Sequence, residues 1–124
     1  DNNIKFGITN GTDSQQLESE DFDQTTDPQI MVADWSSGSD VRLFINGNLR
    51  NSQLDGEAVT GTLAGADRVL VGTGPKEGDD GTWDGLVGEV MMFTTKINDA
   101  QRTIFENYLA AKYSIPISND FFSN

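Results

Sequence analysis

The first half of the chain shows apolar side chains in the short patterns that β-strands favour. Residues 4–8 alternate apolar with polar or small side chains, which is typical of a half-buried strand. Residues 29–35 hold a near-continuous apolar run and predict a strand buried on both faces. The polar, acidic residues 15–28 predict a long loop with one weak strand.

The dipeptide Asn46-Gly47 gives the strongest local signal in the sequence. It follows the apolar residues 41–45, which predict a strand, and it precedes residues 48–50, which predict the start of the return strand. Both residues tolerate the positive φ that a two-residue type I′ hairpin requires. A hairpin is therefore expected at this position.

Further strands are expected in the second half, separated by loops rich in Gly and Asp. Asp55-Gly56 predicts a turn, and apolar residues then predict strands at three places: 58–63, 68–72 and 86–94. Residues 74–85 between the last two read as a loop.

The pattern changes to helical spacing near residue 97. Ala100, Ile104 and Tyr108 recur four residues apart, with Phe105 and Leu109 beside them. Asn98 is a favourable N-cap with Gln101 at the capping-box position, Lys112 suits the last turn, and Pro116 blocks continuation. We expect one amphipathic helix whose apolar stripe packs on the convex face of a sheet; a partner-binding stripe is the alternative.

Several strands followed by one helix predict an all-β fold. The expected architecture is an antiparallel β-sandwich of the jelly-roll type with one C-terminal amphipathic helix. The 124 residues fit a single domain, residues 1–124, and no internal repeat or linker divides them.

Charge narrows the classes of partner. Twenty acidic and eight basic residues give a net charge of −12, which repels phosphate backbones and anionic membranes, so neither nucleic-acid binding nor membrane insertion is expected. There is no Cys for a disulfide and no His for general-base catalysis or zinc binding.

Residues 29–115 resemble the laminin-G-like modules of the concanavalin A-like lectin and glucanase superfamily. The likeness rests on three pieces in order: the strand and hairpin that end at Asn46-Gly47, the run from Trp83 to Val90, and the closing helix that ends in Tyr-Leu-Ala-Ala-Lys-Tyr at residues 108–113. It covers only the later part of the family's domain. The resemblance implies either a small sandwich or N-terminal strands supplied by another segment or a neighbouring chain, and it implies ligand binding at loop rims.

The resemblance also implies ligands that are carbohydrate or protein, sometimes with calcium. The acidic loop holds four carboxylates among glycines, and calcium accepts six to eight oxygen ligands. The candidate metal ligands are Glu77, Asp79, Asp80 and Asp84. A solvated turn is the competing interpretation, and Asp34 and Asp40 join the set only if they lie at the same rim.

Candidate ligand-binding residues are Trp35, Asp40 and Trp83. Exposed aromatic rings stack on sugars, but core packing is the favoured interpretation of both tryptophans, with Trp35 the better rim candidate. Glu89 interrupts an apolar run and suggests a catalytic acid, but the further carboxylates of a glucanase motif are missing from residues 90–94.

The expected function is therefore a non-catalytic binding or adhesion module, located outside the cell or on a cell or virion surface. It would recognise its ligand through loops 36–40, 74–84 and 10–28. A structural subunit of a virion decoration, fibre or filament that assembles through sheet edges is the first alternative. A fragment of a glycoside hydrolase is the second.

Overall fold

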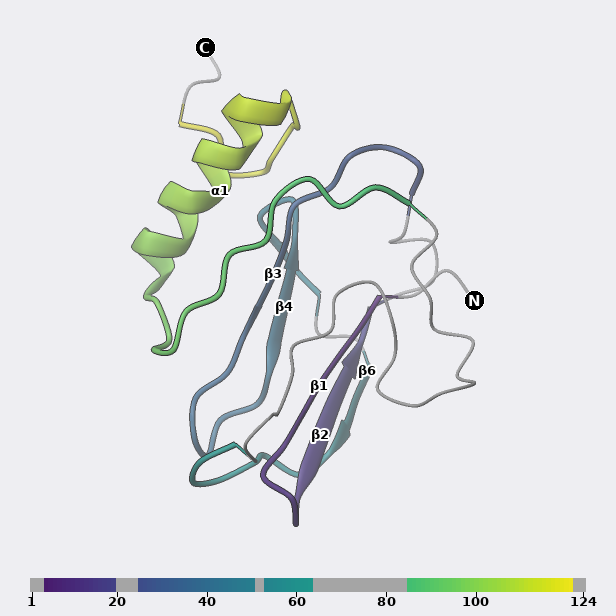
Figure 1. Ribbon diagram of the computed structural model, residues 1–124, viewed down its shortest axis with the longest axis vertical. Coiled ribbons are helices and arrows are strands. Elements are labelled where there is room, and N and C mark those ends of the chain that lie inside the picture. The colour runs from purple at the N-terminus through teal and green to yellow at the C-terminus, as the bar shows by residue number, and fades with distance from the viewer. Residues whose placement is uncertain (1–3, 20–24, 51–52, 64–84, 122–124) are drawn as a thin grey trace. The chain divides into compact units, whose positions relative to one another are not determined.

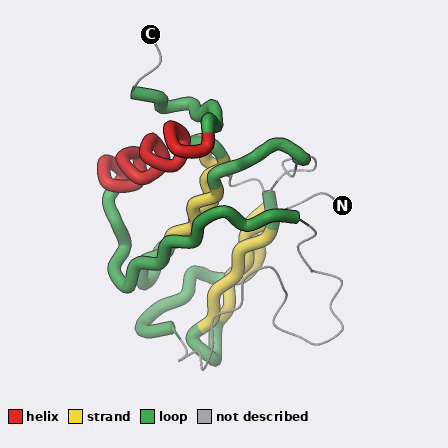
Figure 2. Tube along the Cα trace, turned by 45° about the horizontal axis from the view of Figure 1, so that its top comes forward, coloured by secondary structure: helices red, strands yellow, loops and turns green. Residues whose placement is uncertain are grey.

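The computed structural model describes residues 4–19, 25–50, 53–63 and 85–121. Contacts divide the chain into two compact units, one made of residues 1–64 with 95–124 and the other of residues 65–94. All described helices and strands belong to the first unit, which holds two small antiparallel sheets and one C-terminal helix (Figures 1 and 2). The predicted strand at 68–72 lies outside the described residues.

The first sheet contains β1 (Lys5–Thr9), β2 (Ser14–Glu18) and β6 (Gln53–Gly56) in the order β1-β2-β6. The strand at residues 4–8 is confirmed with a shift of one residue. We expected only a weak strand within 15–28, whereas β2 is the central strand, with Leu17 opposite Phe6 on one side and Leu54 on the other.

The second sheet contains β3 (Met31–Asp34), β4 (Arg42–Ile45) and β5 (Asn48–Leu49) in that order. The predicted hairpin is confirmed, because Asn46 and Gly47 adopt φ of 50° and 81° between β4 and β5. The prediction that the 29–35 strand is buried on both faces is wrong, since β3 pairs only with β4 among the described strands and alternates between exposed and half-buried positions.

One apolar cluster joins residues of both sheets. Leu17 of β2 packs with Val41, Leu43 and Ile45 around β4, and all four are almost completely buried. Half-buried side chains of β1 and Trp35 lie against them. Alternation along a strand explains this cluster, because Leu43 and Ile45 share one face of β4 while Phe44 takes the other.

Helix α1 (Asp99–Tyr113) begins and ends as the sequence predicted. The Asn98 side chain accepts a hydrogen bond from the backbone N–H of Gln101, and the Gln101 side chain accepts one from the backbone N–H of Asn98. Ser114 closes the helix in the left-handed region with φ of 55°. Pro116 follows within two residues, where it cannot interrupt helical hydrogen bonds.

The helix packs on the sheet through a face that differs from the predicted one. Ile104 and Tyr108 are 60% and 48% exposed, so this part of the expected apolar stripe faces solvent, whereas Leu109 packs against the second sheet as expected. The buried face carries Arg102, Glu106 and Asn107, with Ala110 at its C-terminal end. Ala110 joins Ile30 and Ile115 in a second apolar cluster, and Arg102 lies over Phe44 of β4.

Two further strand predictions are wrong. Residues 58–63 form a loop, although Val59 is fully buried, and the preceding strand β6 occupies the place where we expected the Asp55-Gly56 turn. Residues 86–94 form no strand, and apolar side chains such as Leu86 and Met92 are exposed there. Local patterns do not distinguish a strand from an extended loop when long-range pairing is the deciding factor.

Candidate functional site

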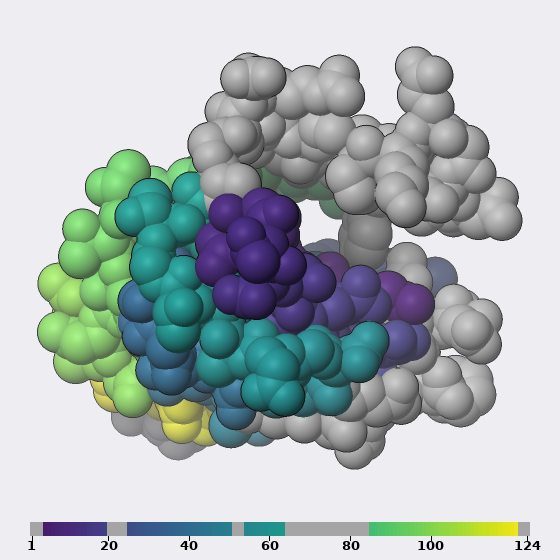
Figure 3. Space-filling model, turned by 90° about the horizontal axis from the view of Figure 1, so that it is seen from below, coloured from purple at the N-terminus to yellow at the C-terminus, as the bar shows by residue number. Residues whose placement is uncertain are grey.

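Three loops meet at one end of the first unit, and hydrogen bonds hold them together. They are the β1–β2 turn at residues 10–13, the loop 35–41 and the loop 57–63, and we call their meeting place the loop rim. Figure 3 shows the N-terminal hairpin in purple beside the teal residues that follow β6. The rim thus gathers two of the loops expected to bind ligand, together with one that sequence reasoning missed.

Each hydrogen bond between the rim loops uses at least one backbone group. The Asn10 side chain donates to the carbonyl of Thr60 at 3.0 Å. The backbone N–H of Gly38 donates to the carbonyl of Val59 at 2.9 Å, and that of Gly61 donates to the hydroxyl of Ser37 at 2.8 Å. Loops fixed in this way present a preformed surface, which lowers the entropy cost of binding.

The Asn10 side chain also fixes the hairpin tip itself. Its Oδ1 accepts hydrogen bonds from the backbone N–H groups of Thr12 and Asp13 at 2.8 and 2.7 Å, which is an Asx-turn arrangement. The Thr12 side chain is exposed beside this turn. The tip is therefore rigid at its backbone and open at its side chains.

A buried glutamine ties the rim to both sheets. Gln15 of β2 donates from its Nε2 to Asp40 at 2.8 Å and accepts at its Oε1 from the backbone N–H of Val41 at 2.9 Å. Both ends of this buried amide are satisfied, as an interior polar group requires. Asp40, a predicted ligand-binding residue, is exposed and held in place by this bond.

The other predicted site residues fall into two groups. Trp35 is half-buried against the Leu17 cluster, and its indole Nε1 has no hydrogen-bond partner among the described residues. The remaining predicted residues lie outside the described residues: Glu77, Asp79, Asp80, Trp83 and Asp84. Loop 74–84 lies entirely outside the described residues, so its expected position at the rim and the calcium hypothesis stay predictions. Over the ranges that the structure describes, no three acidic side chains gather closely enough to hold a metal ion.

Asp34 lies outside the loop rim and connects the second sheet to the helix. Arg42 donates two hydrogen bonds of 2.9 and 2.6 Å to the Asp34 carboxylate, and the Nζ of Lys96 lies 3.4 Å from the same carboxylate. Burial acts to raise the pKa of Asp34, but the hydrogen bonds and charges of these cations outweigh it, so the pKa lies below its usual value. Arg42 also contacts Asp99 in the first helical turn at 3.2 Å.

A second ion pair lies between the helix and the sheet. Arg102 donates to the Glu106 carboxylate at 2.7 Å, and the Arg102 guanidinium lies 3.9 Å from the centre of the Phe44 ring. Burial raises the pKa of Glu106, and Arg102 offsets this only partly. Glu89, the other acid considered for catalysis, is exposed in the second unit.

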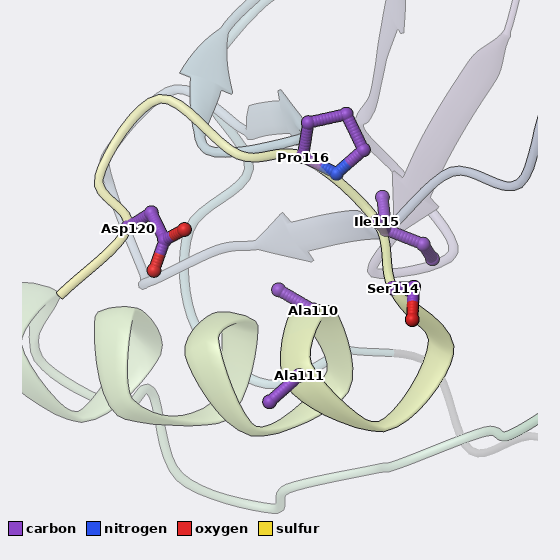
Figure 4. Close-up of a pocket in the computed structure, with 6 residues that line it drawn as sticks. All are labelled: Ala110, Ala111, Ser114, Ile115, Pro116 and Asp120. Carbon is purple, nitrogen blue, oxygen red and sulfur yellow. The ribbon is translucent and has the colours of Figure 1, made fainter. Parts of the chain in front are cut away.

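Two cavities lie at the C-terminal end of α1. The larger, of about 410 Å³, is lined by Asn46 and by residues of two segments, 25–29 and 114–116. The smaller, of about 320 Å³, is lined by the helix end and the tail that follows it (Figure 4). Both share Ser114, Ile115 and Pro116. The sequence held one signal for this site: Ser114 occupies a position where a helix end favours Gly.

Comparisons with protein-family models, with curated proteins and with solved structures find no match to this chain. The laminin-G-like resemblance consequently stays an expectation drawn from the residues themselves. Among the described residues, no helix combines the length and the apolar character that crossing a membrane demands.

Proposed function

We propose that this chain is a non-catalytic binding module that recognises carbohydrate or protein through its loop rim. The single observation that carries the proposal is the convergence of residues 10–13, 35–41 and 57–63 through cross-loop hydrogen bonds. Loops held by a rigid scaffold are the usual place for recognition, because their side chains are not needed to pack the core and can contact a ligand. The module acts outside the cell or on a cell or virion surface.

In this proposal the two sheets are layers of a β-sandwich of the jelly-roll type, completed by strands from another segment or chain. The shared Leu17–Leu43 cluster supports the layering, since side chains of facing sheets interdigitate in a sandwich. The laminin-G-like likeness of residues 29–115 supports the same view. Within the described ranges β1 and β3 each pair on one side only, which is consistent with further strands beside them.

The rim proposal is tested with a glycan array followed by titration of the strongest hit. Thr12→Arg and Ser39→Arg place bulk and charge at two exposed rim positions. Each should weaken binding by roughly tenfold or more, because a misplaced charge at an interface costs several kcal/mol. Ala100→Arg, on the exposed face of α1, is the control and should leave affinity unchanged. Equal affinity of all three variants would overturn the rim as the binding surface.

Calcium is proposed as an aid to binding through Glu77, Asp79, Asp80 and Asp84. A site filled to 100 times its Kd adds about 2.7 kcal/mol to the free energy of unfolding. Thermal melting with increasing calcium should therefore show a rise in Tm. No rise at millimolar calcium would remove the metal from the proposal and leave the rim untouched.

Assembly into a larger structure is a second candidate, because apolar side chains are exposed on two segments. Ile104 and Tyr108 on α1 are 60% and 48% exposed, and Leu86, Met92 and Phe93 in the second unit are exposed by half or more. Exposed apolar groups mark interaction surfaces where they gather in one patch. Light scattering coupled to size exclusion tests this candidate: a monomer at about 100 µM speaks against it.

A further inference from the structure

We propose that the larger cavity at the C-terminal end of α1 binds an organic ammonium group, such as the side chain of a lysine or an alkylamine. This cavity, of about 410 Å³, is separate from the loop rim and lies between segment 25–29, the Asn46 turn and segment 114–116. Its volume is within the range of small-ligand pockets. The inference does not depend on the function proposed for the rim.

Backbone conformation singles out this place. Asn46 and Ser114 are the two non-glycine residues with positive φ in the part of the chain that the structure describes, and both line the larger cavity. Asn46 is explained by its hairpin turn. Ser114 is the C-cap of α1, where its backbone N–H donates to the carbonyl of Ala110, although glycine would adopt this left-handed conformation without the cost of about 1–2 kcal/mol that other residues bear. Residues held in such conformations concentrate at functional sites.

Polar groups without a hydrogen-bond partner among the described residues line the cavity, and two of them, Asp27 and Ser114, are exposed to solvent. The Asp27 carboxylate and the Ser114 hydroxyl form no hydrogen bond or ion pair within the described ranges, and neither does the Nδ2 of Asn46, whose Oδ1 accepts from Ile30 at 2.8 Å. A carboxylate and a hydroxyl are acceptors that match the three N–H donors of an ammonium group. The cavity therefore offers a hydrogen-bonding end.

Electrostatics select a cation over an anion. Among the described residues, neither cavity has a Lys or Arg in its lining, and each has one carboxylate, Asp27 in the larger and Asp120 in the smaller. The end of a helix carries a partial negative charge from its last carbonyl groups. A net charge of −12 adds to the same field. The charge of the lining, the helix end and the net charge of the chain each disfavour phosphates and carboxylates.

The apolar part of the lining suits an alkyl chain. Pro28, Ile115 and Pro116 present hydrocarbon surface beside the polar groups, and Figure 4 shows the ring of Pro116 and the side chain of Ile115 near the helix end. An inorganic cation would gain nothing from this surface and would need several more oxygen ligands. An ammonium group on a hydrocarbon stem uses both kinds of lining.

The test is a titration of the whole chain with n-butylammonium chloride, followed by ¹H–¹⁵N NMR at constant ionic strength. The expected result is saturable shifts at Asp27, Asn46 and Ser114 with a Kd of about 1 mM, which is a small binding free energy typical of a fragment. 1-Butanol has a similar shape without the charge and should bind at least tenfold more weakly. Equal affinity for the alcohol would overturn the role assigned to charge.

Two variants and one control make the result specific. Asp27→Asn should weaken butylammonium binding about tenfold, since a hydrogen bond to a charged group is among the stronger ones. Asp55→Asn removes the same charge from β6, which lines neither cavity, and should leave the Kd unchanged. Equal weakening by both variants would mean diffuse attraction to an acidic surface and would overturn the site.

Ser114→Gly guards against misfolding of the other variants, because glycine suits the left-handed position. It should raise Tm while weakening the ammonium by several-fold through loss of the hydroxyl. Unchanged affinity in Ser114→Gly would remove Ser114 from the site. Saturable binding of calcium or of glucose with the same NMR shifts, at tenfold lower concentration than butylammonium, would overturn the ammonium assignment itself.

Discussion

The two faces of the four-residue strand β4 make different kinds of contact with their neighbours. Leu43 and Ile45 turn toward Leu17 of the first sheet and form an apolar contact. Phe44 turns toward the helix and meets the guanidinium groups of Arg42 and Arg102, at 5.1 and 3.9 Å from its ring centre. The face toward the first sheet is thus purely apolar, whereas the face toward the helix relies on charged groups: Arg102 lies over Phe44, and Arg42 connects Asp34 to Asp99. The Ile30 cluster adds an apolar contact between the helix and the second sheet.

The two contacts should respond differently to solution conditions. Hydrophobic burial is indifferent to pH and is strengthened by sulfate-like salts. A buried ion pair is shielded from salt but depends on the protonation of its acid. The helix-facing side of β4 is therefore the pH-sensitive side, and substitutions on the two faces should separate these effects.

The largest effect is expected when Arg102 is replaced by Met. Glu106, fully buried, then loses its partner, and removal of one member of a buried pair costs about 3–5 kcal/mol of unfolding free energy. Urea denaturation followed by circular dichroism measures the loss. The double variant Arg102→Met with Glu106→Leu should recover most of it, since a hydrophobic replacement removes the unpaired charge. Failure of the double variant to recover would place the cost in lost packing against Phe44.

The next effect is expected from Leu43→Ala on the opposite face of the strand. Leu43 is 2% exposed, and truncation of a buried leucine costs about 2–5 kcal/mol. Thermal melting at pH 4.5 and pH 7 measures this cost, which should be equal at the two pH values because no titrating group lies in the Leu17 cluster. A cost that changed with pH would contradict the separation of the two faces.

A smaller effect is expected from the titration of Glu106. Burial raises the pKa of Glu106 above its ordinary 4.5 in the folded state, with Arg102 opposing the shift only in part. The resulting stabilisation is complete below the unfolded pKa and is lost as pH rises through the folded pKa. The stability of the natural chain relative to Glu106→Gln should therefore fall as pH rises from about 4 toward neutrality.

Asp34 gives the matching control with the opposite sign. Its pKa is lowered in the folded state, so its contribution is present above the unfolded pKa and is lost as pH falls through the folded pKa. The difference between the natural chain and Asp34→Asn should shrink on acidification. Parallel pH profiles for Asp34→Asn and Glu106→Gln would contradict the assigned directions.

The smallest effect is expected at the beginning of α1. Asn98→Ala removes the side-chain acceptor for the backbone N–H of Gln101 and should cost about 1 kcal/mol. Thermal melting should show a modest drop in Tm, and Asn98→Asp should restore it. An Asn98→Ala loss as large as that of Leu43→Ala would mean that the cap also supports the Asp34–Arg42–Asp99 contacts.

Some features of the candidate site follow from local sequence patterns, and others do not. Asp40 was expected at a rim and lies there, but nothing in the sequence indicates that Gln15 holds it in place from a strand twenty-five residues earlier. The cavity at the helix end combines segments near residues 27, 46 and 115, which no spacing rule connects. Only the serine in a position that favours glycine gave a local hint.

Local sequence was enough to predict the elements whose hydrogen bonds close within a few residues. The Asn46-Gly47 turn and the Asn98–Gln101 capping box are of this kind, because their energies depend on local backbone and side-chain geometry. Tertiary structure alone decided the pairing of β2 with β6 and the choice of the helix face. Gly56 seemed a turn residue, yet it lies in a strand where a Cβ would collide with the carbonyl oxygen of Ser14. The helix buries Arg102 and Glu106 in place of Ile104, because Phe44 and the apolar Ile30 cluster contact the face of the helix that carries Arg102. These partners are distant in sequence, so the local periodicity of the helix does not reveal them.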